Sequence, residues 1–199
     1  MGQTAQPRRM GPVGSATWHA MLDGAQAILR DEGNAALTSR RVAEMIGVKQ
    51  RLVYYYFRTM DDLVVALFKR LAESELARLT EITTSKTPLH DLWDVSVHSA
   101  DARLVSEFTA LANRIDGLGR EVIAFIERTR TLQVELLTAA MRRSGGESGL
   151  SAAALAFLAT SAALALAREN ELGVDMGHGD VRQAIEAFLD IIEPAPLSR

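Results

Sequence analysis

The chain of 199 residues is 48% hydrophobic and 24% charged, which is ordinary for a soluble globular protein with a sizeable core. It contains no cysteine, which excludes disulfide bonds and thiolate metal sites and favours a reducing, cytoplasmic location. The net charge of −3 hides an asymmetry, because residues 1–70 hold 10 Lys and Arg against 6 Asp and Glu, whereas residues 71–199 hold 12 against 19. A basic end on an acidic body is typical of a protein in which one end binds a polyanion.

The first 14 residues contain Gly and Pro with little apolar periodicity, which predicts a disordered arm over residues 1–14. No apolar run follows Arg8 and Arg9, so no secretory signal is expected. These two arginines are candidates for contacts to phosphate or to a minor groove. Incidental charge on an unstructured start is the simpler interpretation.

A first helix is predicted after the arm. Ser15 or Thr17 can cap its start, and Gly33 or Asn34 suits a left-handed residue at its end. Its apolar residues recur at three- and four-residue spacing, which predicts one buried stripe made of Trp18, Met21, Leu22, Ala25, Ile28 and Leu29.

Two short helices follow, separated by a glycine. Thr38 or Ser39 can cap the second helix, which Gly47 ends. The third runs over residues 49–57, with Val53, Tyr56 and Phe57 on its inward face. Two helices joined by a turn of three or four residues that contains Gly are the helix-turn-helix pattern.

The outward face of the third helix carries groups that suit DNA, namely Lys49, Gln50, Arg51, Tyr54 and Tyr55. Gln can form a bidentate contact to adenine and Arg to guanine, while Lys and the Tyr hydroxyl reach phosphate. A packed aromatic cluster is the alternative interpretation of the three consecutive tyrosines. Because consecutive helical residues point about 100° apart, all three cannot share one buried face.

The segment LTSRRVAEMIGVKQRLVYYYF at residues 37–57, followed by DDLVVAL, resembles the TetR family of bacterial transcriptional regulators. The resemblance covers residues 15–70 by motif and the remainder by helix count and order. It implies an all-α fold with a helix-turn-helix DNA-binding head at residues 15–60 and an effector-binding and dimerisation domain at residues 61–199. Together, the residues and the resemblance predict a DNA-binding set made of Thr38, Arg40, Lys49, Gln50, Arg51, Tyr54, Tyr55 and Tyr56.

Three residues depart from the family pattern, namely Leu52, Arg51 and Met60. The first stands where a polar residue is common, the second replaces a small residue, and the third takes the place of a Lys at the start of the fourth helix. Thr59 and Asp62 predict a capping-box start there instead, which leaves Arg58 as a substitute phosphate contact. The family's contact set is therefore not expected in full.

Six further helices are predicted, which makes nine with no strand pattern and no internal repeat. They are expected over residues 59–79, from Pro88 onward, and over 101–115, 118–143, 150–170 and 181–193, the last capped by Asp180. The connection at residues 144–149 reads as flexible, and the tail at 194–199 as non-helical.

Residues 150–167 are uncharged for 18 residues, close to the lower limit for a membrane span. Half of them are Ala, and neither an aromatic belt nor a flanking Lys/Arg cluster supports insertion. The stretch therefore predicts a buried helix that packs closely through small side chains, and no membrane contact. The resemblance implies that the last two long helices pair with those of a second copy in a four-helix bundle; a monomer with a central Ala-rich helix is the alternative.

His90, Asp94 and His98 lie at positions i, i+4 and i+8 and could share one helix face that binds Zn²⁺ or Fe²⁺. Ordinary polar residues on an exposed face are the simpler interpretation, so no metal and no cofactor is expected. No nucleophile–base pair, phosphate loop or pair of catalytic carboxylates is visible, so we do not expect an enzyme.

The resemblance implies a ligand pocket, which the residues support only through scattered aromatic and polar side chains. The candidates are Trp93, Phe108, Asn113, Arg114, Phe125, Arg128 and Phe157. The sequence thus predicts a ligand-responsive repressor that binds a palindromic operator in double-stranded DNA as a homodimer and is released by a small apolar effector. The rival classes are a helical small-molecule-binding protein without DNA binding and a metal-dependent helical enzyme.

Overall fold

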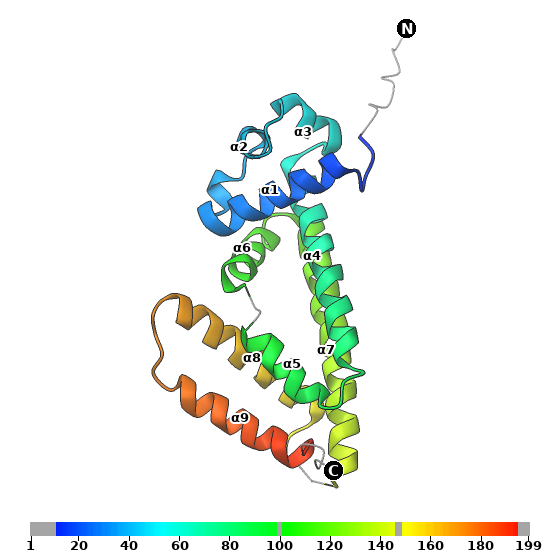
Figure 1. Cartoon of the computed structure of the whole chain (residues 1–199), viewed down its shortest axis with the longest axis vertical. Helices are drawn as coiled ribbons and strands as arrows, with labels where there is room; N and C mark the ends of the chain where they lie inside the picture. The colour runs from blue at the N-terminus through cyan, green and yellow to red at the C-terminus, as the bar shows by residue number, and fades with distance from the viewer. Residues whose placement is uncertain (1–10, 99–100, 146–148, 195–199) are drawn as a thin grey trace. The chain divides into compact units, whose positions relative to one another are not determined.

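The computed structural model describes residues 11–98, 101–145 and 149–194. These residues form nine α-helices and one short 3₁₀ helix without any strand, which confirms the all-α prediction (Figure 1). In chain order the elements are α1 (Ala16–Glu32), η1 (Asn34–Ala36), α2 (Ser39–Met45), α3 (Gln50–Tyr56), α4 (Met60–Ile82), α5 (Pro88–His98), α6 (Ala102–Ala112), α7 (Asp116–Ser144), α8 (Ala152–Glu171) and α9 (His178–Ile192).

The chain folds into two compact units, each assembled from two separate segments. The head unit consists of the chain up to Leu71 together with Glu107–Val122, and the body unit consists of Ala72–Ser106 together with the chain from Ile123 onward. Helices α4, α6 and α7 each supply residues to both units. The division into functional domains at residues 15–60 and 61–199 remains a prediction about activity rather than about compactness.

The core of the head unit is built on α1. Five residues of its predicted stripe are fully buried, and Trp18, the sixth, stacks on Phe57 with 6.2 Å between ring centroids. Other side chains of this core with an exposure of 1% or less are Val42, Val53, Leu63, Leu67 and Leu118. Burying one such aliphatic side chain stabilises the fold by about 1.5–3 kcal/mol, so this stripe is a main source of the head's stability.

The predicted helix caps of the head are confirmed. The Ser15 hydroxyl accepts a hydrogen bond from the Trp18 amide at 3.2 Å, and the Thr38 hydroxyl accepts one from the Arg41 amide at 3.2 Å. At the start of α4, the Thr59 amide donates to the Asp62 carboxylate at 3.0 Å, and the Asp62 amide donates to the Thr59 hydroxyl at 3.1 Å. Each side chain satisfies a backbone group that the first helical turn leaves unpaired.

The predicted arm ends in an ordered residue. Gly11 is buried, and its amide donates a hydrogen bond to the Tyr55 carbonyl at 2.8 Å. A Cβ atom added to Gly11 would lie 2.6 Å from two ring carbons of Tyr56, so this close approach requires glycine. The expectation of disorder up to residue 14 therefore fails at Gly11. Arg8 and Arg9 lie outside the described residues, as do 146–148 of the predicted connection and 195–199 of the predicted tail.

The body unit is a helical core formed by parts of α5, α7, α8 and α9. Its buried members are Leu89, Trp93, Val97, Leu137, Ala140, Ala156, Ala163, Leu166, Leu189 and Ile192. The start of α9 differs from the prediction, because Gly177 adopts φ +82° and lets the helix begin at His178. Asp180 consequently lies in the first turn and does not cap the helix.

Helix α8 corrects the expectation of a buried Ala-rich helix. Only Ala156, Ala163 and Leu166 are buried, and 17% of its most apolar stretch lies inside the chain. Phe157 and Leu158 are 61% and 52% exposed. Because α8 is apolar on every face, the sequence pattern could not indicate which face the rest of the chain covers. The helix is long and apolar enough to cross a membrane, but it packs in the body core and lies far from the N-terminus, so it is no signal sequence.

Candidate nucleic-acid interface and ligand cavity

The short helix α3 presents one polar face to solvent. Gly47 at φ +70° turns the chain after α2, and Val53 and Phe57, at 1% and 3% exposure, fix the opposite face of α3 in the core. The residues left exposed are Lys49, Gln50, Arg51, Tyr54 and Tyr55. Each residue that was predicted on the outward face of this helix is therefore exposed.

A chain of hydrogen bonds orders two of these side chains. The Gln50 Nε2 donates to the Ser39 Oγ at 2.8 Å, and the Ser39 Oγ donates to the Tyr54 Oη at 3.0 Å. Ser39 is 4% exposed, so it holds the pair from beneath. Toward the residues that the structure describes, Gln50 leaves its carbonyl oxygen and one N–H without a partner, and the Tyr54 hydroxyl leaves its own proton to donate.

Sequence reasoning considered Ser39 only as an alternative helix cap. Its partners lie 11 and 15 residues further along the chain, on the far side of the Gly47 turn. No periodicity of one helix reveals such a relation, because it depends on how α2 and α3 pack.

Two of the residues predicted to bind DNA, Tyr56 and Thr38, support the fold of the head unit. Tyr56 is 9% exposed, its hydroxyl accepts a hydrogen bond from the Ser15 Oγ at 3.4 Å, and its ring meets Tyr55 edge to face at 5.4 Å. This burial does not fit the contact to DNA backbone or bases that was expected of Tyr56. It fits a support for Tyr55, which is 41% exposed. Thr38 acts as the cap of α2, as the resemblance implied.

The cations around α3 fall into two groups. Arg41 is held by a bidentate ion pair to Glu32 at 2.7–3.2 Å. Arg40 pairs with Glu44 at 2.8 Å, but both side chains are exposed, at 81% and 51%, and such pairs exchange easily for another anion. Within the described part of the chain, Lys49, Arg51 and Arg58 take part in no ion pair.

The body unit contains a small cavity of about 50 Å³. It is lined by Leu89, Leu92, Trp93, Ser96, Gln133, Leu137, Ala156, Ala159, Thr160, Ile185 and Leu189, from α5, α7, α8 and α9. Apolar side chains make most of this wall, and no charged side chain contributes to it. Such a site suits an apolar molecule with few polar groups.

Of the seven predicted ligand residues, only Trp93 lines this cavity. Phe108 belongs to the head unit, where its ring packs on Phe68 at 5.2 Å, and Phe157 lies at the surface beneath the Arg130 guanidinium, 5.3 Å from its ring centroid. Phe125 is half-buried, whereas the remaining three are exposed, namely Asn113, Arg114 and Arg128. The kind of side chain could not indicate which face of each helix turns inward, so the predicted set is not brought together.

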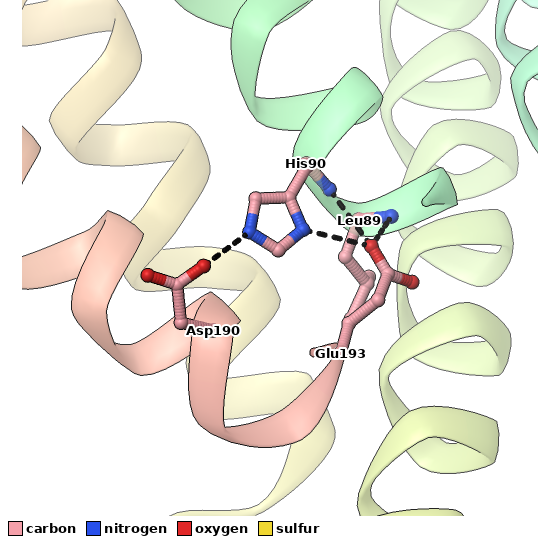
Figure 2. Close-up of polar contacts among 4 residues, drawn as sticks. All are labelled: Leu89, His90, Asp190 and Glu193. Atoms are coloured by element: carbon pink, nitrogen blue, oxygen red, sulfur yellow. Dashed lines mark hydrogen bonds and ion pairs between the residues drawn. The ribbon is translucent and has the colours of Figure 1, made fainter. Parts of the chain in front are cut away.

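His90 joins the start of α5 to the end of α9 (Figure 2). Its Nδ1 lies 3.1 Å from Glu193 Oε2 and its Nε2 lies 3.1 Å from Asp190 Oδ1. The same Glu193 oxygen accepts hydrogen bonds from the amides of Leu89 at 2.8 Å and His90 at 3.1 Å. Glu193, 6% exposed, thus caps α5 from another helix, where a negative charge also suits the helix dipole.

This arrangement separates the three residues that could have shared a metal ion. His90 turns to α9, whereas the His98 Nδ1 contacts the Asp94 carbonyl and carboxylate, both at 3.0 Å. Among the residues that the structure describes, no three His, Asp or Glu side chains form a group that could hold a metal ion. The i, i+4, i+8 spacing therefore leads to one long-range pairing, of His90 with α9, and one local pairing, of His98 with Asp94, rather than to one shared site.

Comparisons with known proteins place these features in context. Residues 21–67 match the family model described as bacterial regulatory proteins, tetR family. No curated protein is similar enough to the chain to match it. Among solved structures, a TetR/AcrR family regulator is 16% identical with a TM-score of 0.75, covering 89% of this chain and 98% of its own.

Two further structures have the same fold. NemR of E. coli in its reduced form is 14% identical with a TM-score of 0.74, over 90% of this chain and 100% of its own. FadR of Bacillus subtilis, solved in complex with stearoyl-CoA, is 15% identical with a TM-score of 0.60, over 90% and 100%. At these identities the likeness shows the fold, over nearly the whole length of the chains compared.

Proposed function

We propose that the chain is a TetR-family DNA-binding transcriptional regulator, a repressor that binds a palindromic operator as a homodimer and leaves it when a small apolar effector occupies the body cavity. The observation that carries this proposal is the exposed face of α3. There Gln50 and Tyr54 are ordered through Ser39, beside Lys49 and Arg51, which form no ion pair with any residue that the structure describes.

This face can both position the protein on DNA and read bases. Lys49 and the Tyr54 hydroxyl supply phosphate contacts, which carry no sequence information. Gln50 retains the acceptor and the donor that a bidentate contact to adenine needs, and the Arg51 guanidinium fits the O6 and N7 acceptors of guanine. A helix as short as α3 reads only a few base pairs, so one copy alone selects weakly.

A second copy would double the reading surface. Apolar side chains stay exposed along α8 and α9, including Phe157, Leu158, Leu164, Val181 and Ile191. A two-fold dimer through these helices would cover them and would present two α3 helices to half-sites one helical turn of DNA apart, or a multiple of it. A monomer remains the alternative, and it leaves this apolar surface in water.

The cavity supports an effector role. FadR of Bacillus subtilis has the same fold and was solved with stearoyl-CoA, whose acyl chain is apolar, and the cavity wall of this chain is also mainly apolar. An effector shifts DNA affinity only if it binds the DNA-competent and the released states unequally. Helices α4 and α7 each contribute residues to both units, which supports a role for these two helices in the response to an effector.

Selection of bound sequences from a random pool of duplex DNA tests the proposal. The full chain should recover a palindrome, and Arg51→Ala should lose discrimination at one base of each half-site, about 1–3 kcal/mol. Arg30→Ala, on α1 and paired with Asp31, is the matched control and should select the same sequence as the wild type. Recovery of no preferred sequence, with no salt-dependent DNA binding, would favour the rival small-molecule-binding protein.

A further inference from the structure

A short segment ahead of α1 contacts the end of α3. The Gly11 amide donates a hydrogen bond to the Tyr55 carbonyl at 2.8 Å, and the Ser15 Oγ donates one to the Tyr56 hydroxyl at 3.4 Å. These two bonds join the last two residues of α3 to the segment that leads into α1.

Helix α3 needs such partners because it is short. It spans 7 residues, whereas isolated helices shorter than about 12–15 residues are only marginally stable in water. The last four carbonyl groups of a helix have no partner within the helix, and the carbonyl of Tyr55 is one of them. The Gly11 amide therefore supplies a hydrogen bond that α3 itself cannot, and it fixes the position of the C-terminal end of α3.

The missing side chain of Gly11 matters as much as its amide. A Cβ atom at this position would lie 2.6 Å from two ring carbons of Tyr56 and 2.9 Å from the Cε1 of Tyr55. The Tyr56 ring meets the Tyr55 ring edge to face at 5.4 Å. The Tyr55 ring thus packs against both Gly11 and Tyr56, which fixes its direction, although the residue is 41% exposed.

The Tyr55 hydroxyl forms no hydrogen bond with any residue that the structure describes, whereas the hydroxyls of Tyr54 and Tyr56 each form one. Tyrosine hydroxyls are among the groups that bind DNA phosphates, and such contacts position a protein on the duplex. A ring that is already held in one direction loses little conformational entropy when its hydroxyl binds, so it binds more tightly than a free one.

We propose that Gly11 is a positioning residue for DNA binding, because its amide and its lack of a side chain hold the Tyr55 ring so that the Tyr55 hydroxyl donates a hydrogen bond to a phosphate oxygen of the duplex. The inference rests on the proposed DNA-binding function and adds to it a residue outside the helix-turn-helix. The alternative is a purely structural role, in which Gly11 stabilises the head unit without acting through Tyr55.

A double-mutant cycle separates these two roles. Tyr55→Phe removes the hydroxyl but keeps the ring, so the Cβ of Gly11→Ala disturbs the same ring contacts in both backgrounds. The probe is a fluorescein-labelled duplex that carries the selected palindrome, titrated with the full chain by fluorescence anisotropy. Gly11→Ala should weaken binding about fivefold when residue 55 is tyrosine, and less than about twofold when it is phenylalanine.

Val13→Ala is the matched control, because Val13 lies in the same segment, is 76% exposed and should bind DNA like the wild type in both backgrounds. Ethylation of single phosphates gives a second measurement. The same phosphate of each half-site should matter to the wild type and no longer matter to Gly11→Ala or Tyr55→Phe. If circular dichroism shows that Gly11→Ala does not fold, removal of residues 1–11 takes its place in the cycle, because any effect of the charges that it removes is equal in both backgrounds.

Equal losses of affinity in the two backgrounds would show a structural role and overturn the proposal. A palindrome affinity that Gly11→Ala or Tyr55→Phe leaves unchanged would overturn it too. The proposed repressor function fails through a different result, namely a wild-type chain that selects no DNA sequence and shows no salt-dependent binding. In that event the role of Gly11 falls with it, whereas a wild type that binds the palindrome while the cycle shows no coupling disproves only the role of Gly11.

Discussion

Both ring nitrogens of His90 face a carboxylate oxygen, so both can donate hydrogen bonds only when the ring is protonated. Burial lowers the pKa of His90, but the hydrogen bonds to Glu193 and Asp190 and the charges of these groups outweigh it, and the net pKa is raised above 6.5. A raised pKa in the folded state means that protonated His90 stabilises the fold. The unprotonated ring turns a lone pair toward one of the two carboxylates.

The stabilisation by His90 should therefore depend on pH. It is fully present below pH 6.5, the ordinary value for histidine, and is lost as the pH rises through the raised pKa of the folded state. We expect His90→Gln to lower the free energy of unfolding by about 1 kcal/mol at pH 5.5 and by less at pH 8.5, measured with urea. His98→Gln, at the exposed end of α5, is the control. If the loss of unfolding free energy in His90→Gln were larger at pH 8.5 than at pH 5.5, the predicted pH dependence would be wrong.

Ser39 makes a second prediction at the scale of one residue. Ser39→Ala removes the oxygen that receives the Gln50 amide and supports the Tyr54 hydroxyl, so both side chains lose their fixed positions. Affinity for the selected operator should fall by about 1 kcal/mol, roughly fivefold, in a fluorescence anisotropy titration. Tyr54→Phe should weaken all DNA sequences alike. An unchanged operator affinity for Ser39→Ala would show that the hydrogen-bond chain does not order the reading face.

Among the elements, α8 and α9 combine an exposed apolar surface with a proposed role in dimerisation. Leu164→Glu would place an unpaired charge in the middle of that interface. We expect dimerisation to weaken by roughly 3 kcal/mol, about a hundredfold, so that sedimentation finds the 21.7 kDa chain instead of a species of twice that mass. Ala139→Glu, at an exposed position of α7, should remain dimeric. A wild-type chain that sediments as a monomer would end this proposal.

The features that could be predicted from the sequence are those that neighbouring residues decide. The stripe of α1 and the caps at Ser15, Thr38 and Thr59 follow from spacing and from side chains within three or four residues. Helix α8 could not be assigned a covered face, because its apolar side chains surround the axis. The burial of Tyr56 depends on Gly11, and the position of Glu193 depends on a partner more than 100 residues away.

For the whole molecule, the head unit depends on a distant segment. The Glu107 carboxylate of α6 accepts hydrogen bonds from Asn34, at 3.2 Å from the backbone amide and 2.7 Å from the side-chain amide. Phe108 packs on Phe68, and Lys69 pairs with Glu121 at 2.9 Å. Through these contacts, the loop after α1 and the first half of α4 pack against the segment Glu107–Val122, which follows 40 or more positions later in the chain.

Removing the hydrogen bonds between Glu107 and Asn34 should destabilise the head unit. Glu107→Ala leaves the backbone and side-chain donors of Asn34 without their acceptor, and should lower the free energy of unfolding by about 1–2 kcal/mol. Amide hydrogen exchange should show the loss in η1 and the adjoining end of α1 first. Glu73→Ala, at an exposed site of α4, should leave the exchange rates as they are.

The discontinuous head unit also decides when the protein can become active during its synthesis. Domains usually fold as the N-terminal part of a chain leaves the ribosome. Here the helix-turn-helix leaves first, but the segment Glu107–Val122 that completes its unit follows only after residues 72–106 of the body have been made. A nascent chain stalled before Glu107 carries every residue of α3 without the full support of its unit. Binding to the proposed operator should therefore appear late in translation, after residues 72–106 of the body unit have been synthesised.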